Sequence, residues 1–158
     1  MSVAFRREGD EEHLEPKFEI PIPPGPNLVT ARGLGLIDAK VTELEAEIAR
    51  LGSSGAEPAQ VEATKRDLRY WQTRQITAEV VPVPSGETVE IGTTVRFRQT
   101  GKERELTIVG DDEAEPGAGR IAFSAPIARA LLHAQVGDLL DFAGRAEGLE
   151  VLAIDVVS

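Results

Sequence analysis

The stretch IVGDDEAEPGAGRIAFSAPIARALLHAQVGD, from Ile108 to Asp138, decides the fold of the C-terminal part of this chain. It opens with an apolar strand that ends in three consecutive acids, Asp111 to Glu113. It continues with a short helix, expected over Pro126 to Ala134, because proline is favoured at the first position of a helix. The stretch therefore predicts a strand, an acidic loop and one helix within a single small domain.

Alternating apolar residues predict strands on both sides of this stretch. Val95, Phe97 and Gln99 alternate with arginines, and TGK at residues 100–102 is a hairpin turn signal. Such alternation places every second side chain on one face, so the strands are expected to be half buried. With one helix among several strands, the prediction is an α+β fold. Further strands are predicted around Leu106 and Ile108, Ile121 and Phe123, Leu140 and Phe142, and Leu152, Ile154 and Val156.

The region before these strands predicts an antiparallel helical hairpin. Thr30 is a good N-cap residue for its first helix, and GSSG at residues 52–55 is expected to end that helix. Pro58 suits the start of the second helix, and VPVP at residues 81–84 stops it. Two helices joined by a short turn pack antiparallel. The first helix has a coiled-coil seam at Ile37, Val41, Leu44, Ile48 and Leu51.

The second helix is expected to turn a continuous apolar side towards the first. Val61, Leu68 and Trp71 are predicted to face inward, and Ile76 and Val80 to continue that side. Tyr70 and Trp71 are adjacent aromatics, for which stacking on RNA is one interpretation and core packing the favoured one.

Prolines make the N-terminal segment irregular. We therefore expect three parts: a Pro-rich extension over residues 1–27, the helical hairpin arm over 28–82, and a β domain over 83–158. FEIPIPP at residues 18–24 is expected either to lie extended against a neighbouring element or to be disordered.

Composition excludes several classes of function. The net charge of −10 argues against a general nucleic-acid binder, whose affinity for phosphates comes from lysine and arginine. It suits a basic partner surface, or simply solubility. There is no cysteine, and His13 and His133 lie far apart in sequence, so no metal site is expected. No membrane-spanning run and no signal peptide are found, so we expect a cytoplasmic protein. We also expect it to be a monomer.

IVGDDEA at residues 108–114, APIARALL at residues 125–132 and VGD at residues 136–138 resemble the C-terminal domain of the bacterial GreA/GreB family of transcript-cleavage factors. The likeness runs from about Val89 to Val157. LVTARGLGLIDAKVTELEAEI and RDLRYWQTRQITAEVV are similar to the two helices of the family's arm. The resemblance implies an FKBP-like antiparallel sheet wrapped on one helix. It also implies a partner, the RNA polymerase core enzyme, bound at its secondary channel.

In this family, acids at the tip of the arm help to hold a second Mg²⁺ at the polymerase active site. Here the tip offers only Glu57 and Glu62, without the family's Asp-x-x-Glu-Asn pattern, on an arm that is expected to be short. The alternative is that Glu57 favours the helix dipole and Glu62 is solvated. We therefore expect a protein that modulates elongation with little stimulation of cleavage, and no cofactor of its own.

Carried over by position, the resemblance implies that the acidic loop and the start of the short helix contact the polymerase. Loop acids can meet basic residues through charge-assisted hydrogen bonds. A solvated turn and plain helix initiation are the alternatives. Ala125 stands where the family usually has serine, which removes a hydroxyl from this surface. The residues concerned are Asp111, Asp112, Glu113, Ser124, Pro126, Ile127 and Arg129.

Two other functions are weighed against this interpretation. The first is a module like the Rnk proteins, which resemble Gre factors, have a short arm and are labelled regulators of nucleoside diphosphate kinase. The second is a peptidyl-prolyl isomerase, suggested by the FKBP-like fold. That reaction needs an aromatic-lined pocket, and only Phe97, Phe123 and Phe142 follow residue 84. No phosphate-cradling loop or nucleophile–base set is present, so the chain is not expected to be an enzyme.

Overall fold

A computed structural model describes residues 19–157 of the chain. Residues 1–18 of the predicted extension, which include His13, therefore lie outside the described residues. The chain folds as two compact units. The hairpin unit contains the described residues up to Pro24 and those from Ala39 to Ile76. The β unit contains Gly25–Asp38 and the chain from Thr77 onwards.

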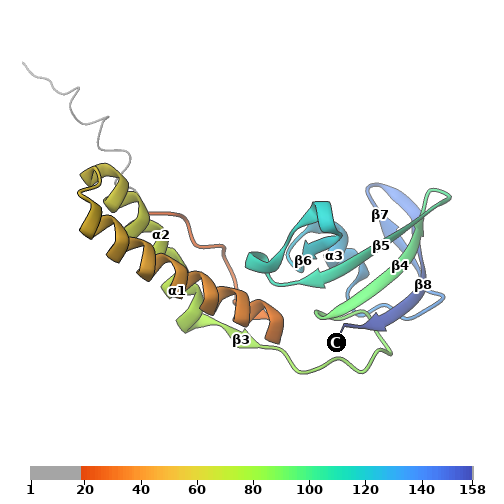
Figure 1. Ribbon diagram of the computed structural model, residues 1–158. Helices are drawn as coiled ribbons and strands as arrows, with labels where there is room; N and C mark the ends of the chain where they lie inside the picture. The colour runs from red at the N-terminus through yellow and green to blue at the C-terminus, as the bar shows by residue number, and fades with distance from the viewer. Residues whose placement is uncertain (1–18, 158) are drawn as a thin grey trace, which may run out of the picture. The chain divides into compact units, whose positions relative to one another are not determined.

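Two long helices form the predicted hairpin (Figure 1). Helix α1 spans Ala31–Ser54 and helix α2 spans Pro58–Thr77. The predicted N-cap is confirmed, since the Thr30 hydroxyl accepts a hydrogen bond from the Gly33 amide at 2.9 Å. The predicted seam is confirmed in α1 at four positions: Ile37, Val41, Leu44 and Leu51 are buried, whereas Ile48 is half-buried.

The turn between the helices lies slightly later than the sequence predicts. Helix α1 continues through Gly52 to Ser54, and Gly55 leaves it with φ +71°, which glycine adopts without strain. The Ser53 and Ser54 hydroxyls donate to the carbonyls of Ala49 and Leu51, which satisfies acceptors of the last turn. Hydrogen bonds from serine side chains thus allow three residues expected in the turn to remain helical.

The prediction of a continuous apolar side on α2 is wrong at its end. Ile76 is 80% exposed and Val80 is 50% exposed. The buried position is Arg74, three residues after Trp71, whereas Ile76 is five residues on and faces another way. Val61, Leu68 and Trp71 are half-buried. The Trp71 ring meets Tyr70 edge-on at 5.2 Å between centroids, which is a packing arrangement.

Two short strands join the chain before α1 to the chain after α2. Strand β2 (Leu28–Val29) pairs in parallel with β3 (Glu79–Val80). The Glu79 and Val81 amides donate to the carbonyls of Asn27 and Val29. The buried Asn27 side chain donates to the Thr77 hydroxyl at 3.1 Å. The residues that flank the hairpin are therefore tied together within the β unit.

The β unit is a five-stranded sheet around one short helix, which confirms the predicted α+β fold (Figure 1). The strand order is β6-β5-β4-β8-β7. All pairs are antiparallel except β5 and β6, so the predicted fully antiparallel sheet is corrected at one edge. The strands are β4 (Thr93–Gln99), β5 (Lys102–Val109), β6 (Arg120–Ala122), β7 (Leu139–Phe142) and β8 (Arg145–Val156).

The predicted hairpin between β4 and β5 is confirmed. Gln99 pairs with Lys102, which leaves Thr100 and Gly101 as a two-residue turn. Both turn residues have positive φ, +47° and +83°, the combination that matches the twist of the two strands. The alternation along β4 buries Val95 and Phe97 completely, as expected.

A bulge in β8 changes which of its side chains are buried. Arg96 pairs with Ala153 but Phe97 pairs with Val151, so the register passes over Leu152. Leu149 and Val151 are buried in the core, and Ile154 packs against it beyond the bulge. The predicted strand is confirmed, but Leu152 lies out of phase with the core.

Helix α3 spans Pro126–Leu131, shorter than predicted. It ends because Leu132 is extended and His133 has φ +74°. The His133 amide donates to the Val89 carbonyl at 2.7 Å, and the Val89 amide donates to the Ala134 carbonyl at 2.9 Å. After α3, backbone groups of His133 and Ala134 thus bond to Val89, in the segment before β4, and not within a longer helix. Ile127, Ala128 and Leu131 pack on the inner face of the sheet.

We expect Leu131→Ala to lower the free energy of unfolding by about 2–5 kcal/mol, because the fully buried side chain would leave a cavity. The matched control is Leu139→Ala, at a position that is 51% exposed, with a loss below about 1 kcal/mol. Urea unfolding measures both values. Equal losses would contradict this description of the core.

Candidate functional site

The acidic loop, Asp111–Glu113, follows directly from the buried end of β5. It forms a single 3₁₀ turn, in which the Glu113 amide donates to the Gly110 carbonyl at 3.2 Å. Asp111 and Asp112 are half-buried, whereas Glu113 is buried. The three acids therefore do not lie together in solvent, as a plain solvated turn would place them.

The loop is hydrogen-bonded to Ser124, two residues before α3. The Ser124 hydroxyl donates to Asp111 Oδ1 at 2.7 Å. Pro126 occupies the first position of α3 and is exposed, and Arg129 is exposed on the same helix. We name this area the loop–helix surface, formed by Asp111, Asp112, Ser124, Pro126 and Arg129.

Two residues predicted for this surface lie inside the β unit instead. Ile127 is only 8% exposed and belongs to the hydrophobic core, where it packs α3 on the sheet. The Glu113 side chain is only 4% exposed. The burial of Ile127 and of Glu113 has the same cause, because a helix or loop that packs on a domain buries one side and exposes the other.

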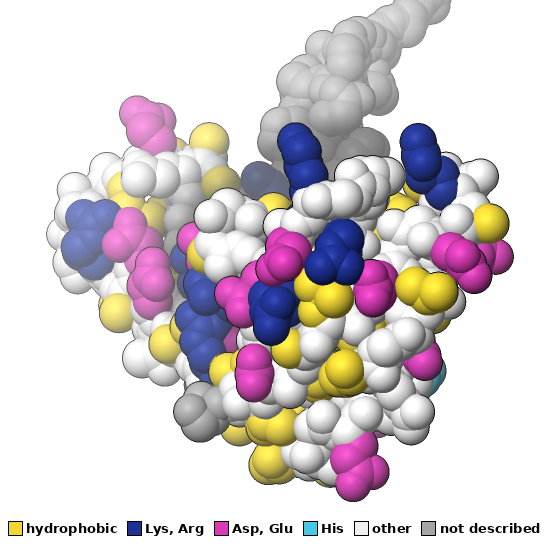
Figure 2. All heavy atoms as spheres, turned by 90° about the vertical axis from the view of Figure 1, so that its right-hand side faces the viewer, with side chains coloured by type: hydrophobic (Ala, Val, Ile, Leu, Met, Phe, Trp, Pro, Cys, Tyr) yellow, Lys and Arg dark blue, Asp and Glu magenta, His cyan; other side chains and the backbone are white. Residues whose placement is uncertain are grey.

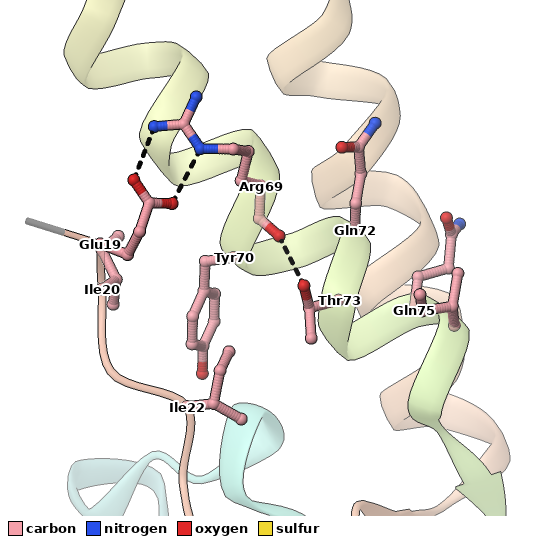
Figure 3. A pocket seen from close by; sticks show the side chains of 9 residues that line it. Glu19, Ile20, Ile22, Arg69, Tyr70, Gln72, Thr73 and Gln75 are labelled. Carbon is pink, nitrogen blue, oxygen red and sulfur yellow. Dashed lines mark hydrogen bonds and ion pairs between the residues drawn. The ribbon is translucent and has the colours of Figure 1, made fainter.

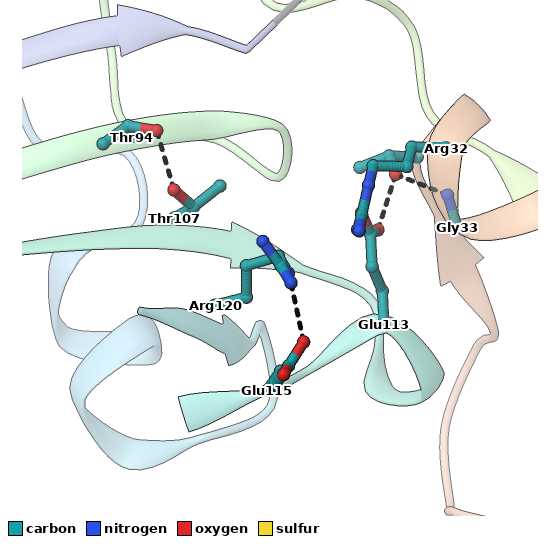
Figure 4. Close-up of polar contacts among 8 residues, drawn as sticks. Arg32, Gly33, Thr94, Thr107, Glu113, Glu115 and Arg120 are labelled. Atoms are coloured by element: carbon teal, nitrogen blue, oxygen red, sulfur yellow. Dashed lines mark hydrogen bonds and ion pairs between the residues drawn. The ribbon is translucent and has the colours of Figure 1, made fainter. Parts of the chain in front are cut away.

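The Glu113 carboxylate meets the start of α1 (Figure 4). The Thr30 hydroxyl donates to Glu113 Oε1 at 2.6 Å, and Arg32 Nη1 donates to Oε2 at 2.7 Å. Nearby, Arg120 Nη2 donates to Glu115 Oε1 at 2.6 Å, which ties the residue before the 3₁₀ turn Pro116–Ala118 to β6. The sequence interpretation did not find the Thr30–Glu113 contact, because its partners lie far apart along the chain.

A groove of about 540 Å³ opens on the β unit. Its walls come from the segment Val80–Pro84, from Ile91 and Val109, and from Val156 and Val157. None of the described residues that line it is aromatic. The groove therefore lacks the aromatic lining expected of a prolyl isomerase site.

A second cleft, of about 660 Å³, lies in the hairpin unit between residues 19–22 and α2 (Figure 3). Arg69 Nε and Nη2 donate to the two Glu19 oxygens, both at 2.8 Å. This hydrogen bond holds the pKa of the Glu19 carboxyl below its ordinary value. Ile20, Ile22 and Tyr70 line the cleft, so the described end of the Pro-rich extension lies extended against α2, one of the two predicted outcomes.

The predicted tip acids lie close to the turn of the hairpin. Glu57 precedes α2 and is exposed, and Glu62 is exposed in its second turn. Glu62 Oε2 lies 3.9 Å from Arg69 Nη1, a distant ion pair. Within residues 19–157, no group of three or more histidine, aspartate or glutamate side chains is placed to hold a metal ion. Nor does any described helix have the length and apolarity needed to cross a membrane.

Acidic and basic side chains are interspersed on the face shown in Figure 2. On the outer face of the sheet, Arg98 pairs with Glu150 at 2.6 Å and with Glu103 at 3.8 Å, and Arg96 pairs with Glu103 at 3.3 Å. Each of these two arginines is therefore paired with a glutamate on the same face.

The candidate site thus combines an acidic loop with a proline-initiated helix on a small mixed sheet. Residues 84–156 match the family model for the C-terminal domain of the transcription elongation factors GreA and GreB. The chain is 47% identical over 83 residues to the transcription elongation factor GreA of Chelativorans sp. (strain BNC1), across 49% of this chain and 53% of that protein. For GreA of Agrobacterium fabrum the identity is 43% over 83 residues, across 49% and 52%.

The chain spans about half the length of the curated relatives it matches. Residues 84–156 are thus a domain of the GreA/GreB C-terminal kind. Similar solved structures include GreA factor homolog 1 (Gfh1) of Thermus thermophilus, at 20% identity and a TM-score of 0.36, over 82% of this chain and 99% of that one. Another is GreA/GreB from Nitrosomonas europaea, at 24% identity and a TM-score of 0.34, over 83% and 96%.

The Glu19–Arg69 contact predicts a pH-dependent attachment of residues 19–22. A carboxyl whose folded pKa is lowered stabilises the contact above its ordinary pKa, and the contribution is lost as the pH falls through the folded pKa. NMR titration of the Glu19 carboxyl carbon should show the lowered pKa, and Arg69→Gln should return it to the ordinary glutamate value. The control is Arg66→Gln, which removes only a weaker charge effect. Equal responses to both substitutions would show that the hydrogen bond is not the main cause.

Proposed function

We propose that this protein binds the RNA polymerase core enzyme at the secondary channel through the loop–helix surface and regulates transcription elongation. The observation that carries the proposal is the match of residues 84–156 to the GreA/GreB C-terminal domain. The geometry supports it, because Asp111 of the acidic motif accepts a hydrogen bond from Ser124, the residue directly before the motif of the short helix. One surface therefore presents carboxylates next to an exposed proline and the Arg129 guanidinium.

The chemistry of this surface suits a basic partner with an apolar side chain. Asp111 and Asp112 supply acceptors for charge-assisted hydrogen bonds. Pro126 is a rigid apolar contact whose burial costs little side-chain entropy. Partly desolvated carboxylates that are already ordered lose less freedom on binding than carboxylates on a mobile loop. The net charge of −10 favours encounter with such a partner at low salt.

We propose further that the arm does not deliver a metal ion to the polymerase active site. Holding Mg²⁺ takes hard oxygen ligands that converge, as in two-metal hydrolysis. Glu57 and Glu62 lie in no described cluster that can hold a metal, and Glu62 faces Arg69. The protein then acts on elongation by occupancy, like a Rnk-like regulator without cleavage activity. It is not itself an enzyme, and the groove of the β unit does not favour the prolyl isomerase alternative.

Charge reversal on the loop–helix surface tests the docking site. Asp112→Lys and Pro126→Ala are each expected to raise the dissociation constant for core polymerase by about fivefold or more, through lost ion pairing and lost apolar contact. Biolayer interferometry at low salt measures the constants. Glu147→Lys, with the same change in net charge near the start of β8, should change affinity by less than about twofold. Unchanged affinity in both surface variants would refute this placement.

An RNA cleavage assay on stalled elongation complexes tests the arm. The wild-type protein is expected to leave cleavage at the rate of polymerase alone, and Glu57→Ala and Glu62→Ala to change nothing. Core binding, measured on the same preparation, confirms that docking is intact. Strong stimulation of cleavage that either substitution abolishes would contradict the proposal for the tip.

A further inference from the structure

A buried carboxylate connects the acidic loop to the start of α1. A charged side chain with 4% exposure is costly unless donors satisfy both oxygens. Glu113 has such donors: the Thr30 hydroxyl serves Oε1 and the Arg32 guanidinium serves Oε2. Both donors come from the first residues of α1 or the position before it, 81 and 83 positions away in sequence. No described residue nearer in the sequence donates a side-chain bond to this carboxylate.

The Thr30 hydroxyl has two roles at once. It caps α1 by accepting from the Gly33 amide at 2.9 Å, and it donates its own proton to Glu113 at 2.6 Å. A hydroxyl that donates to an anion becomes a better acceptor, so the two hydrogen bonds strengthen each other. Capping of α1 and placement of Glu113 are therefore coupled through one oxygen atom.

Two glycines allow close approach where the acidic loop meets the segment that leads into α1. A Cβ atom at Gly33 would lie 2.8 Å from Glu113 Oε1, so any other residue there would displace the carboxylate. A Cβ atom at Gly110 would lie 2.5 Å from the Leu28 carbonyl oxygen. Backbone therefore packs on backbone where the acidic loop begins, and the loop has little freedom to take another shape there.

We propose that Glu113 is a positioning residue: its bonds to Thr30 and Arg32 set the shape of the acidic loop, so that the start of α1 determines how Asp111 and Asp112 are presented to a partner. The loop is held at both ends, by Ser124 at Asp111 and by the α1 start at Glu113. Asp112 lies between these anchors. Glu113 itself makes no contact with the partner. This inference rests on the proposed function for its effect on polymerase, but the coupling is a property of the protein alone.

Amide hydrogen exchange on the full-length protein tests the coupling without polymerase. The variants are Thr30→Val and Glu113→Gln, with Thr30→Ser as the conservative rescue, because serine keeps the hydroxyl. Glu115→Gln is the matched control: it neutralises a neighbouring acid whose side chain is 64% exposed. Exchange is followed at residues 110–115 and compared with the central strands β4 and β8. Dissociation constants for core polymerase are measured on the same samples.

We expect Thr30→Val and Glu113→Gln to speed exchange at residues 110–115 by about tenfold or more, while amides in β4 and β8 change much less. Thr30→Ser and Glu115→Gln should stay within about twofold of wild type. The two disruptive variants should also weaken polymerase binding by about tenfold, although neither residue touches the partner.

Two outcomes would overturn the coupling. Unchanged exchange of the loop in Thr30→Val and Glu113→Gln would show that its shape does not depend on α1. Equal acceleration at every amide would show a loss of global stability only. If wild-type protein fails to bind polymerase, the proposed function fails, and the exchange data still decide the coupling. If wild type binds polymerase, and only the variants with faster loop exchange bind weakly, both the proposed function and the coupling are supported.

Discussion

The placement of the acidic loop depends on one buried negative charge. Without the Thr30 hydroxyl and the Arg32 guanidinium, the Glu113 carboxylate would be buried without donors, at a cost that real proteins avoid. The contact joins residues that are distant in sequence but lie in one compact unit. It makes the first turns of α1 part of the β unit, although the rest of that helix belongs to the hairpin unit. The start of the helix, up to Asp38, thus belongs to the unit that carries the candidate site.

The loop–helix surface is possible because the core beneath it is complete. Ile127, Ala128 and Leu131 anchor α3 on the sheet, which leaves Pro126 and Arg129 outside. On the acidic loop the same division occurs: Glu113 points inward, and Asp111 accepts from Ser124. Each motif of the sequence therefore has one side that folds the domain and another that is presented to a partner. Replacing an inward residue and replacing an outward residue should fail in different ways, the first through loop order or stability and the second through affinity alone.

Most elements of the fold could be predicted from local patterns in the sequence. Alternation located β4 and its hairpin turn, the heptad spacing located the buried seam of α1, and Thr30 was recognisable as a cap. The errors arose where non-local contacts overrode local preference. The bulge at Leu152 changes which side chains of β8 face the core. Helix α3 ends early, where the His133 amide bonds to the Val89 carbonyl. On α2 the buried residue is Arg74 and not Ile76. No periodicity in the sequence encodes these three contacts.

The candidate site was predictable as a set of motifs but not as a geometry. Asp111 and Pro126 were found because they stand in two recognisable motifs, and Ser124 because it directly precedes the second. The inward direction of Glu113 depends on a partner more than eighty positions away. One signal in the sequence was nevertheless available. A glycine three residues after an N-cap threonine lowers helix propensity and leaves room for a close neighbour. Gly33 has that neighbour in the Glu113 carboxylate. Glu113 is therefore better understood as the buried partner of the Thr30 N-cap than as a third contact for a partner protein.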